Sequence, residues 1–125
     1  MQELKNIKVG FIGIGNMGWP MAMNILKAGY DLTVFDMDSV RSESFAVEND
    51  AHCASSLADL SDMDFVITML PNGHVVREVL LETEEGAFIN NVKAECIVID
   101  MSSAEPTGTK ALAEKLAAHN VTLID

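Results

Sequence analysis

Three glycines, Gly13, Gly15 and Gly18, stand at the spacing GxGxxG directly after a short apolar run. In such a turn the first glycine permits the tight bend, the second lets a diphosphate approach the backbone, and the third lets a helix pack against a strand. Asp36 ends a second apolar run eighteen residues after the last glycine, where a carboxylate can accept hydrogen bonds from a ribose. This order predicts a dinucleotide-binding strand, helix and strand over residues 8–38.

The acid at Asp36 bears on which nicotinamide dinucleotide the chain prefers. A carboxylate beside the adenosine ribose repels a 2′-phosphate, so the sequence favours NAD over NADP. Arg41 follows five residues later and could swing toward a phosphate, which keeps NADP open as the alternative. Asp36 could also be an ordinary turn or helix-capping aspartate.

Two further segments follow apolar runs and could reach the same edge of a parallel sheet. Leu70 ends the run DFVITML and Pro71 follows it, so this pair either lines a cofactor cleft or simply stops a strand. Ser102 and Ser103 follow the run ECIVID, which covers residues 95–100, after one intervening residue, Met101. Their hydroxyls could bind a carboxamide or a substrate carboxylate, or they could cap the helix that begins near residue 105.

Apolar runs alternate with helical patterns along the chain, and the candidate binding residues follow the ends of the apolar runs. Strands are predicted at 7–12, 32–35, 51–54, 64–70, 95–99 and 121–124, and helices at about 17–28, 38–49, 55–60, 74–81 and 105–119. Alternation of this kind predicts an α/β fold, a doubly wound and mostly parallel sheet of the Rossmann type. The strand at 7–12 is rich in Ile, Val and Phe, so we expect it at the centre of the sheet.

Composition narrows the class of protein. With 125 residues and 49% hydrophobic content, the chain can form one domain over residues 1–125. Nineteen acids against eight bases give a net charge of −11, which disfavours nucleic-acid binding. An anionic cofactor would then have to be held by backbone amides and a helix dipole.

Other features point to a cytoplasmic protein without a metal. No apolar run approaches the roughly 20 residues that span a bilayer, and residues 1–11 do not resemble a signal peptide. Cys53 and Cys96 lie in apolar surroundings, which predicts small buried hydrophobic residues. The three histidines are scattered without ligand-like spacing, so we expect no metal site.

Three motifs together resemble one family. The run FIGIGNMGWPMA at residues 11–22 is similar to the N-terminal signature of the β-hydroxyacid dehydrogenases, the family of 3-hydroxyisobutyrate dehydrogenase and tartronate semialdehyde reductase. The run TMLP at 68–71 and the run IDMSS at 99–103, followed by Pro106, resemble two later motifs of that family. Family members that prefer NADP tend to have Asn-Arg where this chain has Asp36 and Met37, which also favours NAD.

The resemblance implies a set of binding residues. Ser102 would face a substrate, and the cofactor would be bound by Gly13, Ile14, Gly15, Asn16, Met17, Gly18, Asp36, Leu70, Pro71 and Ser103. Within that set the glycine turn would hold the pyrophosphate, Asp36 the adenosine ribose, and Ser103 the nicotinamide side.

The resemblance also implies what the chain would lack. Family members continue past the position of Asp125 into an all-helical catalytic and dimerisation domain that carries the catalytic lysine. Lys93, Lys110 and Lys115 match no catalytic position, so we predict no catalytic residue here. We expect a chain that binds NAD without turnover, whose full-length form is a homo-oligomer acting on a small 3-hydroxy acid. The alternative is a stand-alone dinucleotide-sensing or interaction module.

Overall fold

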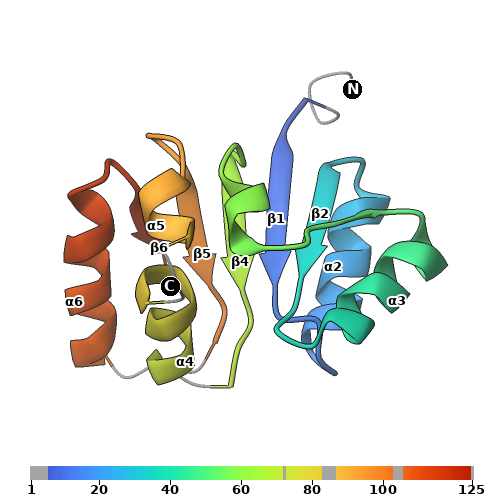
Figure 1. The fold of residues 1–125 in the computed structure, drawn as a ribbon, viewed down its shortest axis with the longest axis horizontal. Coiled ribbons are helices and arrows are strands. Elements are labelled where there is room, and N and C mark those ends of the chain that lie inside the picture. Colours follow the sequence, from blue (N-terminus) through green and yellow to red (C-terminus); the bar gives the residue numbers. More distant parts are fainter. Residues whose placement is uncertain (1–5, 72, 83–86, 103–105, 125) are drawn as a thin grey trace.

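One six-stranded sheet organises the computed structural model, which describes residues 6–71, 73–82, 87–102 and 106–124 (Figure 1). The strands of the described residues run in the order β3-β2-β1-β4-β5-β6, and every neighbouring pair is parallel. They are β1 (Lys8–Ile12), β2 (Asp31–Phe35), β3 (His52–Cys53), β4 (Phe65–Thr68), β5 (Ile97–Asp100) and β6 (Thr122–Ile124). The predicted doubly wound parallel fold is confirmed.

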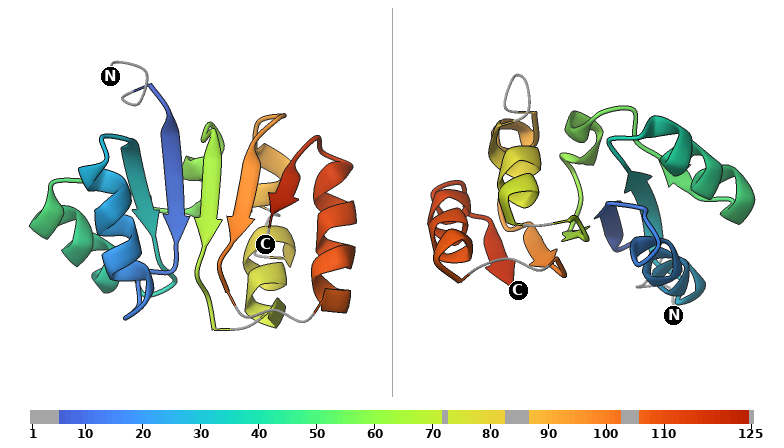
Figure 2. Two further views of the ribbon diagram at one scale, coloured as in Figure 1. Left: turned by 180° about the vertical axis from the view of Figure 1, so that it is seen from behind. Right: turned by 90° about the horizontal axis from the view of Figure 1, so that it is seen from below.

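Helical segments connect the strands. They are α2 (Gly18–Lys27), α3 (Ser39–Asn49), the 3-10 turn η1 (Leu57–Leu60), α4 (Gly73–Arg77), the π-helical turn η2 (Glu78–Glu82), α5 (Ala87–Asn91) and α6 (Pro106–Ala117). The helix predicted at 74–81 is thus α4 continued by a π-helical turn. Seen from below, α2 lies on one side of the sheet, and α4 and α5 lie on the other (Figure 2, right).

Strand β1 is central, as its sequence predicts, because it pairs with β2 on one side and β4 on the other. Val9 and Phe11 point to the face where they pack with Ala22 of α2 and Phe45 of α3. Ile12 points to the other face. A strand covered on both faces in this way is typical of a parallel sheet.

The opposite face carries the larger apolar cluster, built under η1, α4, η2, α5 and α6. Phe88 of α5, Leu116 of α6 and Val98 of β5 are all fully buried in it. Cys96 is buried here too, and burial raises the pKa of its thiol to about 11. Cys53 is half-buried, so the prediction of two buried cysteines is correct for one of them.

The strand register aligns four strand ends at one edge of the sheet. Ile12 pairs with Phe35 and with Thr68, and Thr68 pairs with Asp100. The ladder extends one step further, since the N–H of Met69 donates to the Ile12 carbonyl over 2.9 Å. The residues that follow β1, β2, β4 and β5 therefore lie side by side at this carboxyl edge, at the bottom of Figure 1.

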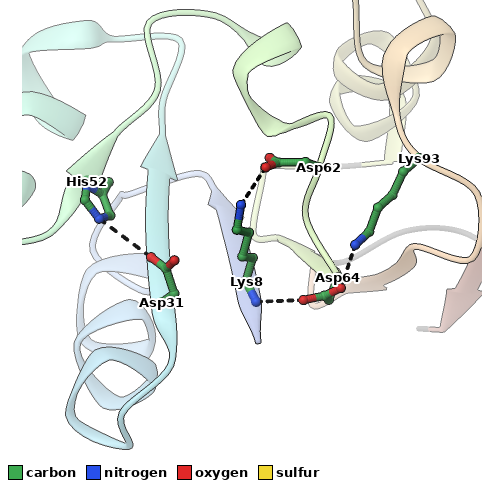
Figure 3. A network of polar contacts seen from close by, with 6 residues as sticks. All are labelled: Lys8, Asp31, His52, Asp62, Asp64 and Lys93. Carbon is green, nitrogen blue, oxygen red and sulfur yellow. Dashed lines mark hydrogen bonds and ion pairs between the residues drawn. The ribbon is translucent and has the colours of Figure 1, made fainter. Parts of the chain in front are cut away.

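The amino edge of the sheet is held by a polar network instead (Figure 3). Asp64 accepts from the Lys93 ammonium over 2.7 Å and from the backbone N–H of Lys8 over 2.8 Å. The Lys8 ammonium donates to Asp62 over 2.7 Å, and His52 lies 3.7 Å from the Asp31 carboxylate. Lys93 therefore contacts Asp64, just before β4, at the edge of the sheet away from the glycine turn.

Part of one sheet face carries no helix. Viewed from behind, no described helix lies in front of β4 and β5 (Figure 2, left). Phe65, Ile67 and Ile99 line an apolar cleft of about 230 Å³ there, next to Ile25 and Tyr30.

Candidate functional site

A cleft of about 410 Å³ opens at the carboxyl edge of the sheet. In open α/β sheets, ligands bind at this edge, where the strand order reverses. Here the reversal lies between β1 and β4. The cleft is lined by Gly13, Gly15, Asn16, Met17, Gly18, Asp36, Met37, Arg41, Met69, Leu70, Pro71 and Val75. Eight of the predicted cofactor residues are thus brought to one place.

Two of the three glycines are required by packing alone. Gly13 has φ of 105°, and a Cβ there would overlap the carbonyl oxygen of Met69. A Cβ on Gly18 would overlap the carbonyl oxygen of Gly13. These two positions let the turn fold tightly between β1 and α2.

Gly15 is different, because space around it is open. Of the described residues beyond its chain neighbours, only Arg41 comes within 4 Å of an ideal Cβ there, through Nη1 at 3.8 Å. A side chain would fit the fold at this point. Its absence leaves bare backbone facing the cleft, which is what close approach of a diphosphate requires.

The start of α2 is left open to an anion. Met17 is its N-cap and makes no side-chain cap hydrogen bond, and its first turn contains no acidic residue. At the same edge, α3 is capped by Asp38, whose carboxylate accepts from the N–H of Val40 over 3.2 Å. The positive end of the α2 dipole can therefore act on a bound phosphate.

Asp36 is held in place by two backbone amides. Oδ2 accepts from the N–H of Ile14 over 2.7 Å, and Oδ1 accepts from the N–H of Asp38 over 2.8 Å. The side chain of Ile14 is fully buried in the core, so only its backbone reaches the site. The carboxylate thus joins the turn after β1 to the turn after β2.

The ends of β4 and β5 are joined by a second set of hydrogen bonds. Ser102 accepts from the N–H of Leu70 through Oγ over 2.7 Å, which takes that amide out of the strand ladder. Asp100 accepts through Oδ1 from the Thr68 hydroxyl and from the N–H of Ser102, each over 2.9 Å. The predicted strand at 64–70 therefore ends at Thr68.

These contacts bear on the two predicted serines. Ser102 was expected either to contact a ligand or to cap a helix. Its hydroxyl instead accepts from the Leu70 amide and donates to the Thr68 carbonyl over 3.5 Å. Ser103 lies outside the described residues. The roles of both toward a ligand stay predictions.

Four cleft-lining residues were not predicted as binding residues: Met37, Arg41, Met69 and Val75. Met17 and Met37 are each 63% exposed, so the mouth of the cleft offers apolar surface. Arg41 was considered from the sequence only as a group that could swing toward a phosphate, and it falls in the first turn of α3.

The part of the chain that the structure describes contains neither a membrane-spanning helix nor a cluster of metal ligands. Its helices are all too short or too polar to cross a bilayer. No group of three or more His, Cys, Asp or Glu side chains is placed to hold a metal there.

The fold and the cleft define a Rossmann-type dinucleotide-binding domain. Residues 8–125 match the family model described as the NAD binding domain of 6-phosphogluconate dehydrogenase. The chain belongs to this family and is a nicotinamide dinucleotide-binding domain.

Curated relatives agree with the predicted resemblance to the β-hydroxyacid dehydrogenases, which is confirmed. The 3-sulfolactaldehyde reductase of Escherichia coli is 35% identical over 117 residues, which are 94% of this chain and 39% of the relative. The mitochondrial 3-hydroxyisobutyrate dehydrogenase of Drosophila melanogaster is 37% identical over 118 residues, 94% of this chain and 35% of the relative. The chain therefore spans about two fifths of the length of these relatives.

A solved structure has the same fold. The 3-hydroxyisobutyrate dehydrogenase of Mycobacterium tuberculosis, solved with L-serine, superposes with a TM-score of 0.82 at 27% identity. The superposition covers 94% of this chain and 38% of that one.

Proposed function

We propose that this chain is the cofactor-binding domain of an NAD-dependent dehydrogenase that interconverts a short 3-hydroxy acid and its semialdehyde. The observation that carries the proposal is the meeting of the glycine turn, Asp36 and the Leu70 and Pro71 strand end in one cleft. The hydroxyacid dehydrogenase names of its relatives support the reaction class.

The residues present fit such a cofactor. The open backbone at Gly15 and the uncapped start of α2 would hold the diphosphate, and Asp36 the adenosine ribose. Leu70 and Pro71 would flank the cofactor, Ser103 would lie at its nicotinamide side, and Ser102 would face the substrate. A nicotinamide ring bound there would supply hydride transfer.

NAD is the proposed cofactor in preference to NADP. The Asp36 carboxylate is fixed by two amides and cannot easily turn away, so a 2′-phosphate placed beside it would be repelled.

The catalytic lysine and the substrate pocket are proposed to lie in an all-helical domain of the full-length enzyme. Of the described residues that line the cleft, none is a lysine, and Lys93 pairs with Asp64 at the opposite edge. The uncovered apolar face of β4 and β5 supports a contact with further protein, either that domain or a second copy in a homo-oligomer. The cytoplasmic location stays a prediction, since the Drosophila relative is named as mitochondrial.

A calorimetric titration with NADH and NADPH tests the cofactor proposal. We expect NADH to bind the chain roughly tenfold more tightly, because an added phosphate meets a fixed carboxylate. Asp36→Ala should weaken NADH binding and reduce the difference between the affinities for NADH and NADPH. The control Glu43→Ala, on the exposed side of α3, should change neither affinity. Absence of binding by both nucleotides would refute the proposal.

Turnover tests the reaction. The full-length gene product should reduce NAD with a short 3-hydroxy acid, while the 125-residue chain should bind NADH without turnover. A full-length product that binds NADH but oxidises no hydroxy acid would favour the alternative, a dinucleotide-sensing module.

A further inference from the structure

We propose that Arg41 contacts the diphosphate of the bound dinucleotide and is the cationic part of its binding site. This inference rests on the proposed function, since it assigns a residue to that same cleft. Arg41 lies in the first turn of α3, and its side chain is exposed at the mouth of the cleft.

The position of the guanidinium carries the inference. Its Nη1 is 3.8 Å from where a Cβ on Gly15 would stand. That is the point at which the fold leaves backbone bare for a diphosphate. The arginine head and the open turn therefore border the same space, one from α3 and the other from the loop before α2.

The acidic charge of the chain makes a basic residue in the cleft important for binding an anion. The chain carries a net charge of −11, which repels an anionic ligand over most of the surface. Of the described residues that line the cleft, Arg41 alone is basic and Asp36 alone is acidic. A guanidinium offers several N–H donors in a planar fork, which suits phosphate oxygens.

The proposed role differs from recognition of a 2′-phosphate. A 2′-phosphate would sit on the adenosine ribose, beside Asp36 and the turn that follows β2. The Arg41 head lies instead over Gly15, on the turn that follows β1. The group it faces there is shared by NAD and NADP, so Arg41 should support both equally.

Calorimetric titration with NADH, NADPH and ADP-ribose tests this assignment, using wild type, Arg41→Gln, Arg41→Lys and the control Lys110→Gln. Lys110 is exposed on α6 and does not line the cleft, so its replacement removes the same charge outside the site. Arg41→Gln should raise all three dissociation constants by the same factor, about tenfold. Arg41→Lys should restore part of the affinity, and Lys110→Gln should match wild type.

The outcomes can be told apart. A loss confined to NADPH would assign Arg41 to the 2′-phosphate and overturn the proposal, as would unchanged affinity for all three ligands. A wild-type chain that binds none of them would instead refute the cofactor-binding function itself. Circular dichroism on each variant checks that the exposed substitutions leave the fold intact.

Discussion

The carboxylate of Asp36 accepts the backbone N–H of Ile14 across 2.7 Å and so joins the end of β2 to the glycine turn. Its other oxygen accepts the N–H of Asp38 across 2.8 Å. The acid expected to bind a ribose therefore also shapes the turn that would bind the diphosphate. Both roles need the ionised carboxylate, which accepts several hydrogen bonds at once.

The turn-shaping role predicts an effect in the absence of nucleotide. In Asp36→Ala the Ile14 amide loses its acceptor, so its hydrogen exchange should speed up by roughly tenfold or more. The control Glu43→Ala removes an equal charge from α3 and should leave that amide protected. Amide exchange followed by NMR measures both, and equal protection in Asp36→Ala and wild type would contradict the bond.

The glycines predict a contrast between stability and binding. Gly18→Ala should lower the free energy of unfolding by about 1–3 kcal/mol or more, because its Cβ meets the Gly13 carbonyl oxygen. Gly15→Ala should leave stability within about 1 kcal/mol of wild type, since the space is open.

Gly15→Ala, which should change stability little, should weaken cofactor binding strongly. The methyl of Gly15→Ala projects toward the diphosphate and should weaken NADH binding about 10- to 100-fold. Urea unfolding and calorimetric titration on the same samples separate the two effects. A Gly15→Ala protein that binds NADH like wild type would place the diphosphate elsewhere.

The buried pair of Thr68 and Asp100 predicts a loss of stability. Thr68 is fully buried and Asp100 is 3% exposed, and the hydroxyl donates to Oδ1 over 2.9 Å. Thr68→Val removes that donor from a buried carboxylate and should cost about 1–3 kcal/mol in urea unfolding. Thr68→Ser keeps the hydroxyl and is the matched control. If the two variants lost the same stability, the cause would be a change in packing.

The network at the amino edge predicts a dependence on pH. The hydrogen bond from Lys93, followed by the one from the Lys8 backbone, holds the pKa of Asp64 below its ordinary value. A carboxyl with a lowered pKa stabilises the fold fully above its unfolded pKa of about 3.9. That contribution is lost as pH falls through the lower pKa of the folded state.

Lys93→Met tests this dependence. Because both side chains are over a third exposed, the variant should lose only about 0.2–1 kcal/mol at pH 7. The difference from wild type should shrink below about pH 3 and in about 1 M salt. Urea unfolding at pH 7 and at low pH measures it, and a difference that grew on acidification would contradict the assignment.

Much of the fold could be predicted from local patterns. The apolar run before Gly13 indicated a strand buried on both faces, and β1 is that strand. The helix predicted at about 17–28 is α2, and Gly29 after it has the positive φ of 104° that glycine adopts readily. These features depend on neighbours in the chain, so residue types suffice to predict them.

Local patterns predicted less well where side chains compete with the backbone. The run from 64 to 70 looked like one strand, yet Ser102 accepts the Leu70 amide and β4 ends at Thr68. The helical pattern at 74–81 also concealed the change from α4 to a π-helical turn. Both outcomes depend on partners or packing that sequence spacing does not specify.

By itself, the sequence determined the strand and helix order, the glycine turn and the acid after the second strand, because these follow from steric and periodic properties of nearby residues. Only the tertiary structure decided that Asp36 binds the Ile14 amide, that Ser102 joins β4 to β5, and that Arg41 lies over Gly15. Each of these contacts joins segments from different strand ends. Parallel register places those ends together, and that register is set by packing across the whole sheet.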